Sequence, residues 1–134
     1  MSDFRDFANL ARAAFPKLNI SVLMFERQTA KGIHTVRHRL RANGPGLLAA
    51  VVSEADTATQ ALVDLQGAVR IARRTYATEL AIRDISRAAG GLDEDAQGHI
   101  RRQLMNCPLL AFDGLVANLR QAARESAQEQ QEAA

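Results

Sequence analysis

The sequence predicts an all-α fold, a single bundle of five or six helices around one long central helix. Apolar residues recur three and four positions apart along most of the chain, which is the spacing of one face of a helix. Proline and glycine interrupt that pattern at residues 16, 44–46, 90–91 and 108. Only 4% of the residues are aromatic and none is Trp, so Leu, Ile, Val and Ala must fill the core. We expect one helical domain over residues 1–126 and a polar, disordered tail over residues 127–134.

Two helices are expected before residue 46. The first covers residues 3–15, where Phe4, Phe7 and Phe15 share one face, and Pro16 forbids its continuation. The second covers residues 20–42. Gly32 weakens this second helix by about 1 kcal/mol relative to Ala without breaking it, and the Gly-Pro-Gly run at residues 44–46 ends it. Its apolar positions, with Thr29 between them, advance in steps of three and four: Val22, Phe25, Ile33, Val36 and Leu40.

Residues 47–55, with the sequence LLAAVVSEA, are apolar on nearly all sides, and we expect a short buried helix there. A strand over LLAAVV is the alternative. The two alanines and the absence of a convincing partner strand elsewhere in the chain favour the helix.

The central helix of the bundle is expected over residues 57–89. At 1.5 Å per residue it would be roughly 50 Å long. Four apolar residues lie off its main seam, so the helix is either central in the bundle or shared with a partner. The seam consists of Ala58, Leu62, Leu65, Val69, Ala72, Tyr76 and Leu80, and the residues off the seam are Val63, Ile71, Ile82 and Ile85.

Two further helices complete the expected bundle. Gly90 and Gly91 end the central helix, and Asp93 is suited to cap the next one, which Pro108 closes. Ile100 and Leu104 face inward from that helix. The final helix carries a seam formed by Phe112, Leu115, Leu119 and Ala122.

The net charge of +2 conceals a gradient along the chain. Residues 1–50 carry eight Lys or Arg against three acidic residues, whereas residues 91–134 carry four Arg against seven acidic residues. Of the 17 basic residues 15 are Arg, whose planar guanidinium binds phosphate through two parallel hydrogen bonds. A high-GC genome would produce the same arginine bias.

Cations gather on one side of the expected helix over residues 20–42. On a helical wheel they lie within about 40° of the direction opposite the apolar face and form a stripe roughly 20 Å long. A second basic group lies on the central helix, and antiparallel packing of the two helices would join both groups into one groove. We predict that this groove binds a nucleic-acid backbone; a merely solvated face is the alternative. The stripe consists of Arg27, Lys31, His34, His38 and Arg41 with Arg37 on its flank, and the second group of Arg70, Arg73 and Arg74.

No arrangement of residues indicates catalysis, so we expect a protein that is not an enzyme. His34 and His38 are four residues apart, as two metal ligands on one helical turn are, but no third ligand is near them. No Gly-rich phosphate loop follows a strand, and we expect neither a metal nor a cofactor. Cys107 has no partner for an internal disulfide, and no secretory signal is recognisable, so we expect a cytoplasmic protein. The longest apolar run is shorter than the roughly 18 residues that span a bilayer, so we expect no membrane contact.

The basic stripe, together with Arg70, Arg73 and Arg74, resembles the small helical subunits of class 1 CRISPR effector complexes. This resemblance implies a compact helical bundle that lines the groove for the guide RNA and its target. Its basic residues would contact phosphates, and its off-seam apolar residues would contact neighbouring subunits.

We therefore expect a non-catalytic subunit that binds the backbone of RNA or single-stranded DNA without sequence preference. Its other partners would be protein subunits or further copies of itself. The alternative is a protein-interaction module, such as a phage or secretion accessory protein or a chaperone, that binds through the off-seam apolar patches.

Overall fold

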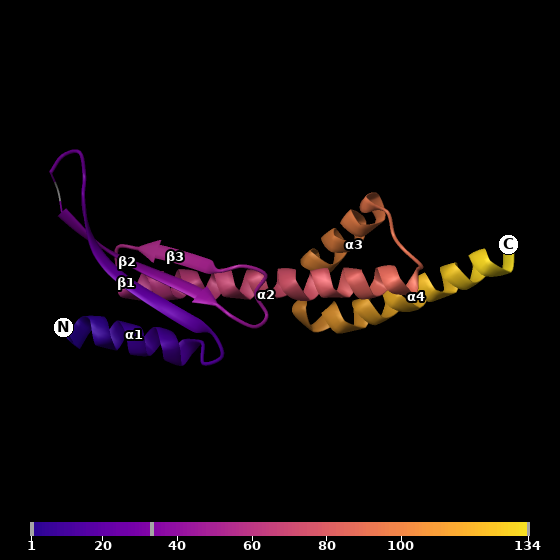
Figure 1. Cartoon of the computed structure of the whole chain (residues 1–134), viewed down its shortest axis with the longest axis horizontal. Coiled ribbons are helices and arrows are strands. Elements are labelled where there is room, and N and C mark those ends of the chain that lie inside the picture. Colours follow the sequence, from indigo (N-terminus) through magenta and orange to yellow (C-terminus); the bar gives the residue numbers. More distant parts are fainter. Residues whose placement is uncertain (1, 33, 134) are drawn as a thin grey trace. The chain divides into compact units, whose positions relative to one another are not determined.

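The chain forms a mixed α/β structure. The computed structural model describes residues 2–32 and 34–133, and these contain both helices and a three-stranded antiparallel sheet (Figure 1). The predicted all-α bundle of five or six helices is therefore wrong. The elements in chain order are α1 (Ser2–Ala14), β1 (Asn19–Gln28), β2 (His34–Asn43), β3 (Val51–Ala55), α2 (Ala58–Ala88), α3 (Glu94–Asn106), the 3-10 turn η1 (Leu109–Ala111) and α4 (Phe112–Ala133).

The sheet has β2 at its centre. Strands β1 and β2 form an antiparallel hairpin in which Val22 lies opposite Leu40. In the turn between them, the amide of Gly32 donates to the carbonyl oxygen of Thr29 at 2.9 Å, and Gly32 has a φ of +79°, which glycine adopts without strain. Strand β3 pairs with the other edge of β2, and Glu54 lies opposite Arg39.

The hairpin replaces the helix that was expected over residues 20–42. Residues spaced three and four apart there fit a helix, but Ile20, Val22 and Met24, with Leu40 and Ala42, also alternate with polar or exposed neighbours at the spacing of a strand. Branched and aromatic residues in the run ISVLMF favour the strand. Ile33, one of the expected apolar positions, lies outside the described residues.

The short helix expected over residues 47–55 is also wrong, because Val51–Ala55 is strand β3. The absence of a partner strand favoured the helix, but β3 has a partner in β2. Because the segment that forms β2 was assigned to a helix, no partner for β3 was expected.

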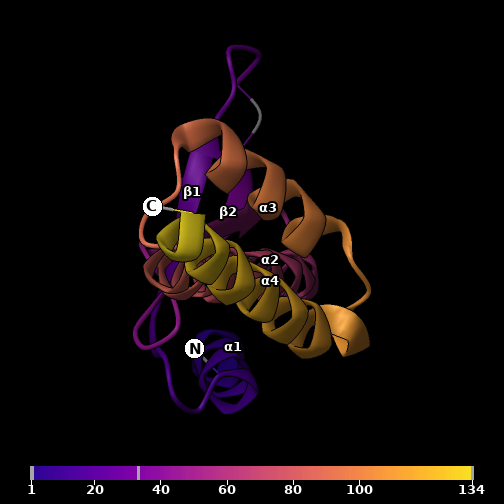
Figure 2. The ribbon, with the colours of Figure 1, turned by 90° about the vertical axis from the view of Figure 1, so that its right-hand side faces the viewer.

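Contacts within the chain divide it into two compact units, Met1–Arg73 and Arg74–Ala134, where one domain was expected over residues 1–126. In the first unit, α1 and the first part of α2 pack against the sheet (Figures 1 and 2). Both helices contact the same face of the sheet, since side chains of all five elements belong to one buried cluster. This cluster includes Phe7, Ala11, Phe15, Ile20, Leu40, Ala42, Ala55, Ala61, Leu65 and Val69.

The second unit contains the rest of α2 together with α3 and α4. Ala81, Ile82 and Leu104 are its buried core, and Ile100, Phe112, Leu115 and Leu119 pack around them. The predicted cap of α3 is confirmed, because the amide of Ala96 donates to Oδ1 of Asp93 at 2.8 Å. The long helix expected over residues 57–89 is confirmed as α2. Helix α4 continues to Ala133, through most of the segment expected to be a disordered tail.

None of the helices formed by residues 2–32 and 34–133 combines enough length and hydropathy to cross a membrane.

Candidate nucleic-acid interface

The sheet of the first unit has one face against helices and one face without them. Because successive side chains of a strand point to opposite faces, Leu40 and Ala42 pack on the helices, while Arg37, Arg39 and Arg41 point the other way. We call this other side the uncovered face. It is formed by Ser21, Leu23, Phe25, Arg27, Thr35, Arg37, Arg39, Arg41, Val52 and Glu54.

Arginines dominate the uncovered face. Three occupy alternate positions of β2 and form a row roughly 14 Å long at the usual rise of a strand. Arg27, on β1 opposite Thr35, extends the row toward the hairpin turn. Leu23 and Val52, on the flanking strands, are 47% and 52% exposed, so this side of the sheet is accessible.

Two of these arginines are held by carboxylates. Oε1 of Glu54 accepts hydrogen bonds from Nε and Nη2 of Arg39 at 3.0 and 2.8 Å, and its Oε2 accepts from Nη2 of Arg37 at 3.2 Å. Nη1 of Arg37 also donates to Oδ1 of Asp56 at 2.7 Å. The uncovered face with adjacent Asp56 thus carries four arginines against two carboxylates and remains basic.

The ion pairs keep their charges at neutral pH. The hydrogen bond from Arg39 lowers the pKa of Glu54, and Arg37 adds to this effect, although partial burial opposes both. Hydrogen bonds to Asp56 and Glu54 raise the pKa of Arg37. A carboxylate with a lowered pKa contributes to stability above its unfolded-state pKa, and that contribution is lost as the pH falls through the lower, folded-state value. The pairs of Glu54 with Arg37 and Arg39 therefore persist at neutral pH and are lost only in acid.

A depression of about 510 Å³ lies beside the hairpin turn, where Arg27 and Arg37 line it together. The hydroxyl of Thr35 donates to the carbonyl oxygen of Arg27 at 3.3 Å and ties the two strands at this point. An anionic oxygen in the depression would have two guanidinium groups and one carboxylate around it. The lining residues are Arg27, Gln28, Thr29, Ala30, Thr35, Arg37 and Asp56.

The predicted stripe is divided by the hairpin. Arg27, Arg37 and Arg41 share the uncovered face, whereas Lys31 lies in the turn and His34 is exposed at the start of β2. His38 points to the helix-covered face. Its ring meets that of Phe7 edge-on, with 5.4 Å between the ring centroids, and its Nδ1 is buried without a hydrogen-bond partner among the described residues.

The second predicted group lies on α2 and does not share the uncovered face. Leu65 and Val69 of α2 pack on the opposite face of the sheet, so exposed Arg70 and Arg73 cannot join the row on β2. Arg74 has a structural role in the second unit. Its guanidinium donates to the carbonyl oxygens of Leu104, at 2.8 Å, and Cys107, and thereby satisfies backbone acceptors at the end of α3.

Arg39 was missing from the predicted site, as were two carboxylates, Glu54, which pairs with both Arg37 and Arg39, and Asp56, which pairs with Arg37. A signal for Arg39 was present, because Arg37, Arg39 and Arg41 alternate with apolar Leu40 and Ala42 at a period of two. The carboxylates had no such signal, since their proximity depends on the pairing of β3 with β2.

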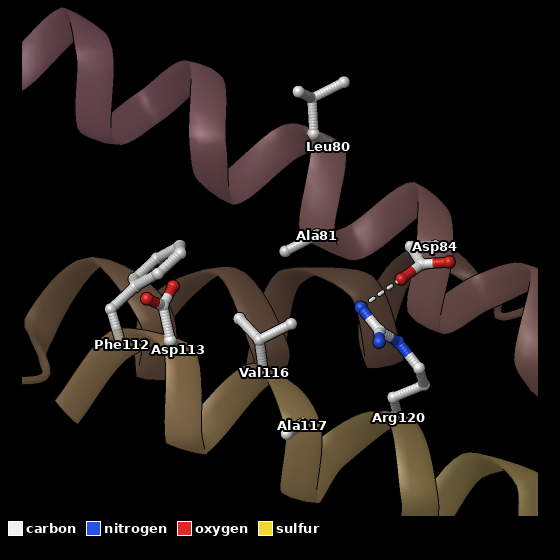
Figure 3. Close-up of a pocket in the computed structure, with 8 residues that line it drawn as sticks. All are labelled: Leu80, Ala81, Asp84, Phe112, Asp113, Val116, Ala117 and Arg120. Carbon is white, nitrogen blue, oxygen red and sulfur yellow. Dashed lines mark ion pairs between the residues drawn. The ribbon is translucent and has the colours of Figure 1, made fainter.

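The second unit has a shallow trough of about 390 Å³ between α2 and α4. Figure 3 shows Ala81, Phe112 and Val116 along it, and the ion pair between Asp84 and Arg120 at one end. Leu80, at its rim, is 44% exposed. In the part of the chain that the structure describes, no three His, Cys, Asp or Glu residues are grouped so that they could hold a metal ion.

Comparison of the chain with known protein families, curated proteins and solved structures finds no match. The resemblance to small CRISPR subunits assumed a compact helical bundle. The three-stranded sheet removes that basis. The class that fold and surface define is therefore an α/β protein with an arginine-rich sheet face that no helix of its first unit covers.

Proposed function

We propose that this is a non-catalytic, cytoplasmic protein that binds the backbone of RNA or single-stranded DNA on the uncovered face of its sheet. The observation that supports this proposal is the row of Arg37, Arg39 and Arg41, extended by Arg27, on the side of the sheet that no helix of the first unit covers. A larger ribonucleoprotein is the setting we propose for this binding. Membership of a CRISPR complex is not part of the proposal, because it depended on an all-helical architecture.

Guanidinium groups suit a phosphate ligand in particular. Each can donate two parallel hydrogen bonds to phosphate oxygens, and contacts to phosphates carry no information about base sequence. Arg39 lies over the ring of Phe25, with 5.0 Å from the guanidinium carbon to the ring centroid, so little aromatic surface is open to bases. We therefore expect binding with little sequence preference.

A charge-reversal experiment tests the proposal. Arg27 and Arg41 form no ion pair with any described carboxylate, so Arg27→Glu with Arg41→Glu leaves the Glu54 and Asp56 pairs intact. Two lost phosphate contacts and two introduced repulsions should lower the affinity for a short fluorescent oligonucleotide by about tenfold or more. Fluorescence anisotropy measures this effect, and circular dichroism verifies that both units remain folded.

The matched control is Arg5→Glu with Arg124→Glu, which changes the net charge equally at exposed helix positions outside the sheet. This control should retain most of the affinity. The wild-type association constant should also fall as salt rises from about 50 to about 200 mM. If the Arg27, Arg41 double variant binds as tightly as this control, the uncovered face is not the binding surface.

A protein-interaction module is the second candidate function. The trough between α2 and α4 favours it, as do Leu109 and Leu110 of η1, which are 71% and 100% exposed. Self-association through these surfaces predicts a molar mass above that of one chain in light scattering, with no dependence on nucleic acid. A monomer at all accessible concentrations would contradict self-association.

A further inference from the structure

We propose that Glu54 and Asp56 are built-in counter-ions that occupy Arg37 and Arg39 and thereby limit the affinity of the uncovered face for a phosphate backbone. This inference rests on the proposed function, because it concerns the regulation of the same surface. It assigns to two acidic residues a role that opposes that of their arginine partners.

Glu54 presents to Arg39 the contacts that a phosphate would make. One carboxylate oxygen accepts from both Nε and Nη2 of Arg39, at 3.0 and 2.8 Å, so one of the two edges through which the guanidinium could donate to a ligand is already occupied. The other oxygen reaches Nη2 of Arg37 at 3.2 Å. A single carboxylate therefore engages the two neighbouring arginines of the row.

The backbone holds this carboxylate in place. Glu54 lies directly opposite Arg39 in the register of β2 and β3, so strand pairing positions its side chain beside the row. Asp56, just beyond β3, is bonded to Nη1 of Arg37 at 2.7 Å, and its side chain is 74% exposed. The four arginines of the face thus divide into two that are engaged and two, Arg27 and Arg41, that form no ion pair within the described part of the chain.

A phosphate that binds Arg37, or the edge of Arg39 formed by Nε and Nη2, must displace a carboxylate or share its donors. The carboxylate of Glu54 is charged at neutral pH, since the hydrogen bond from Arg39 lowers its pKa. Removal of this charge releases the arginines and also removes a repulsion from the phosphate. The protein therefore binds less tightly, and with fewer released counter-ions, than its arginine row alone would permit.

Neutralisation of the acids tests the inference. Glu54→Gln and Asp56→Asn should each raise the affinity for a fluorescent oligothymidylate, by about threefold or more for Glu54→Gln. The plot of log affinity against log salt should steepen by about 0.7 for each additional phosphate neutralised on a single strand. Glu54→Asp retains the charge and should bind like the wild type.

Asp64→Asn is the matched control. Asp64 is exposed on α2, where it accepts from Nε2 of Gln60 at 2.7 Å, and its neutralisation changes the net charge by the same amount. The slope of log affinity against log salt for Asp64→Asn should equal that of the wild type. Circular dichroism verifies that each variant is folded. If Glu54→Gln unfolds the protein, Asp56→Asn still tests the inference, because Asp56 is exposed and its substitution should not disturb the fold.

The outcomes separate the two proposals. If the wild type binds but neutralisation of Glu54 and Asp56 leaves affinity and slope unchanged, or lowers them, the counter-ion role is wrong while the proposed function stands. Lowered affinity would mean that the acids orient the arginines for binding. If neither the wild type nor the Glu54→Gln, Asp56→Asn double variant binds at about 50 mM salt, both proposals fail.

Discussion

At the scale of single residues, neighbouring positions of β2 have opposite environments. Arg37 points to the uncovered face and is bonded to Glu54 and Asp56, whereas His38 points to the helices and meets the ring of Phe7. On a helical wheel of residues 20–42, His38 lies in the basic stripe and Arg37 on its flank. The strand separates them because its side chains alternate between faces at every step.

This alternation predicts that His38 does not bind nucleic acid. His38→Leu should leave the affinity for an oligonucleotide unchanged within about twofold, because the side chain lies on the helix-covered face. It should maintain or raise the free energy of unfolding, because it removes a buried ring nitrogen without a described partner. Anisotropy and urea denaturation measure the two effects, and a large loss of affinity in a folded variant would contradict the assignment.

At the scale of elements, local signals defined helix ends well and defined strands poorly. The long helix expected over residues 57–89 is Ala58–Ala88, and it ends where Gly90 adopts a φ of +77°. Residues 20–42 satisfied helical and strand periods together, so periodicity alone could not decide between them. The choice depends on pairing with β3, which lies beyond the turn over residues 44–50 and was itself assigned to a helix.

The cap of α3 gives a prediction at this scale. Asp93→Ala removes the hydrogen bond to the amide of Ala96 and should lower the free energy of unfolding of the second unit by about 1 kcal/mol. Glu94→Gln is the control, since it removes a neighbouring charge in the first turn but no cap. Thermal denaturation followed by circular dichroism compares the two variants. If both lower the free energy of unfolding equally, the loss is due to charge in the first turn of α3 and not to the cap.

At the scale of the whole molecule, the two units each contain a buried apolar cluster. Leu40 and Leu65 belong to the cluster of the first unit, and Leu104 to that of the second. The arginines of the uncovered face all lie in the first unit, and the trough between α2 and α4 lies in the second. The two candidate functions therefore belong to different units and can be tested separately.

The separate cores predict separate responses to cavity formation. Leu104→Ala, at a fully buried position, should cost about 2–5 kcal/mol and reduce hydrogen-exchange protection in α3 and α4 while amides of β1 and β2 retain theirs. Leu40→Ala should have the converse effect. Hydrogen exchange measured by mass spectrometry resolves the two segments, and equal loss in both units for either variant would indicate one cooperative domain.

The sequence by itself determined the extent of α2, the cap of α3 and the abundance of arginine before residue 46. Each of these depends on residues a few positions apart, and such signals act wherever the chain lies in space. Only the tertiary structure decided that Arg37, Arg39 and Arg41 share a face, and that Glu54 meets two of them. Strand pairing joins separate segments across turns, beyond the spacing of a few residues at which helix signals act, and the register of that pairing sets which side chains meet.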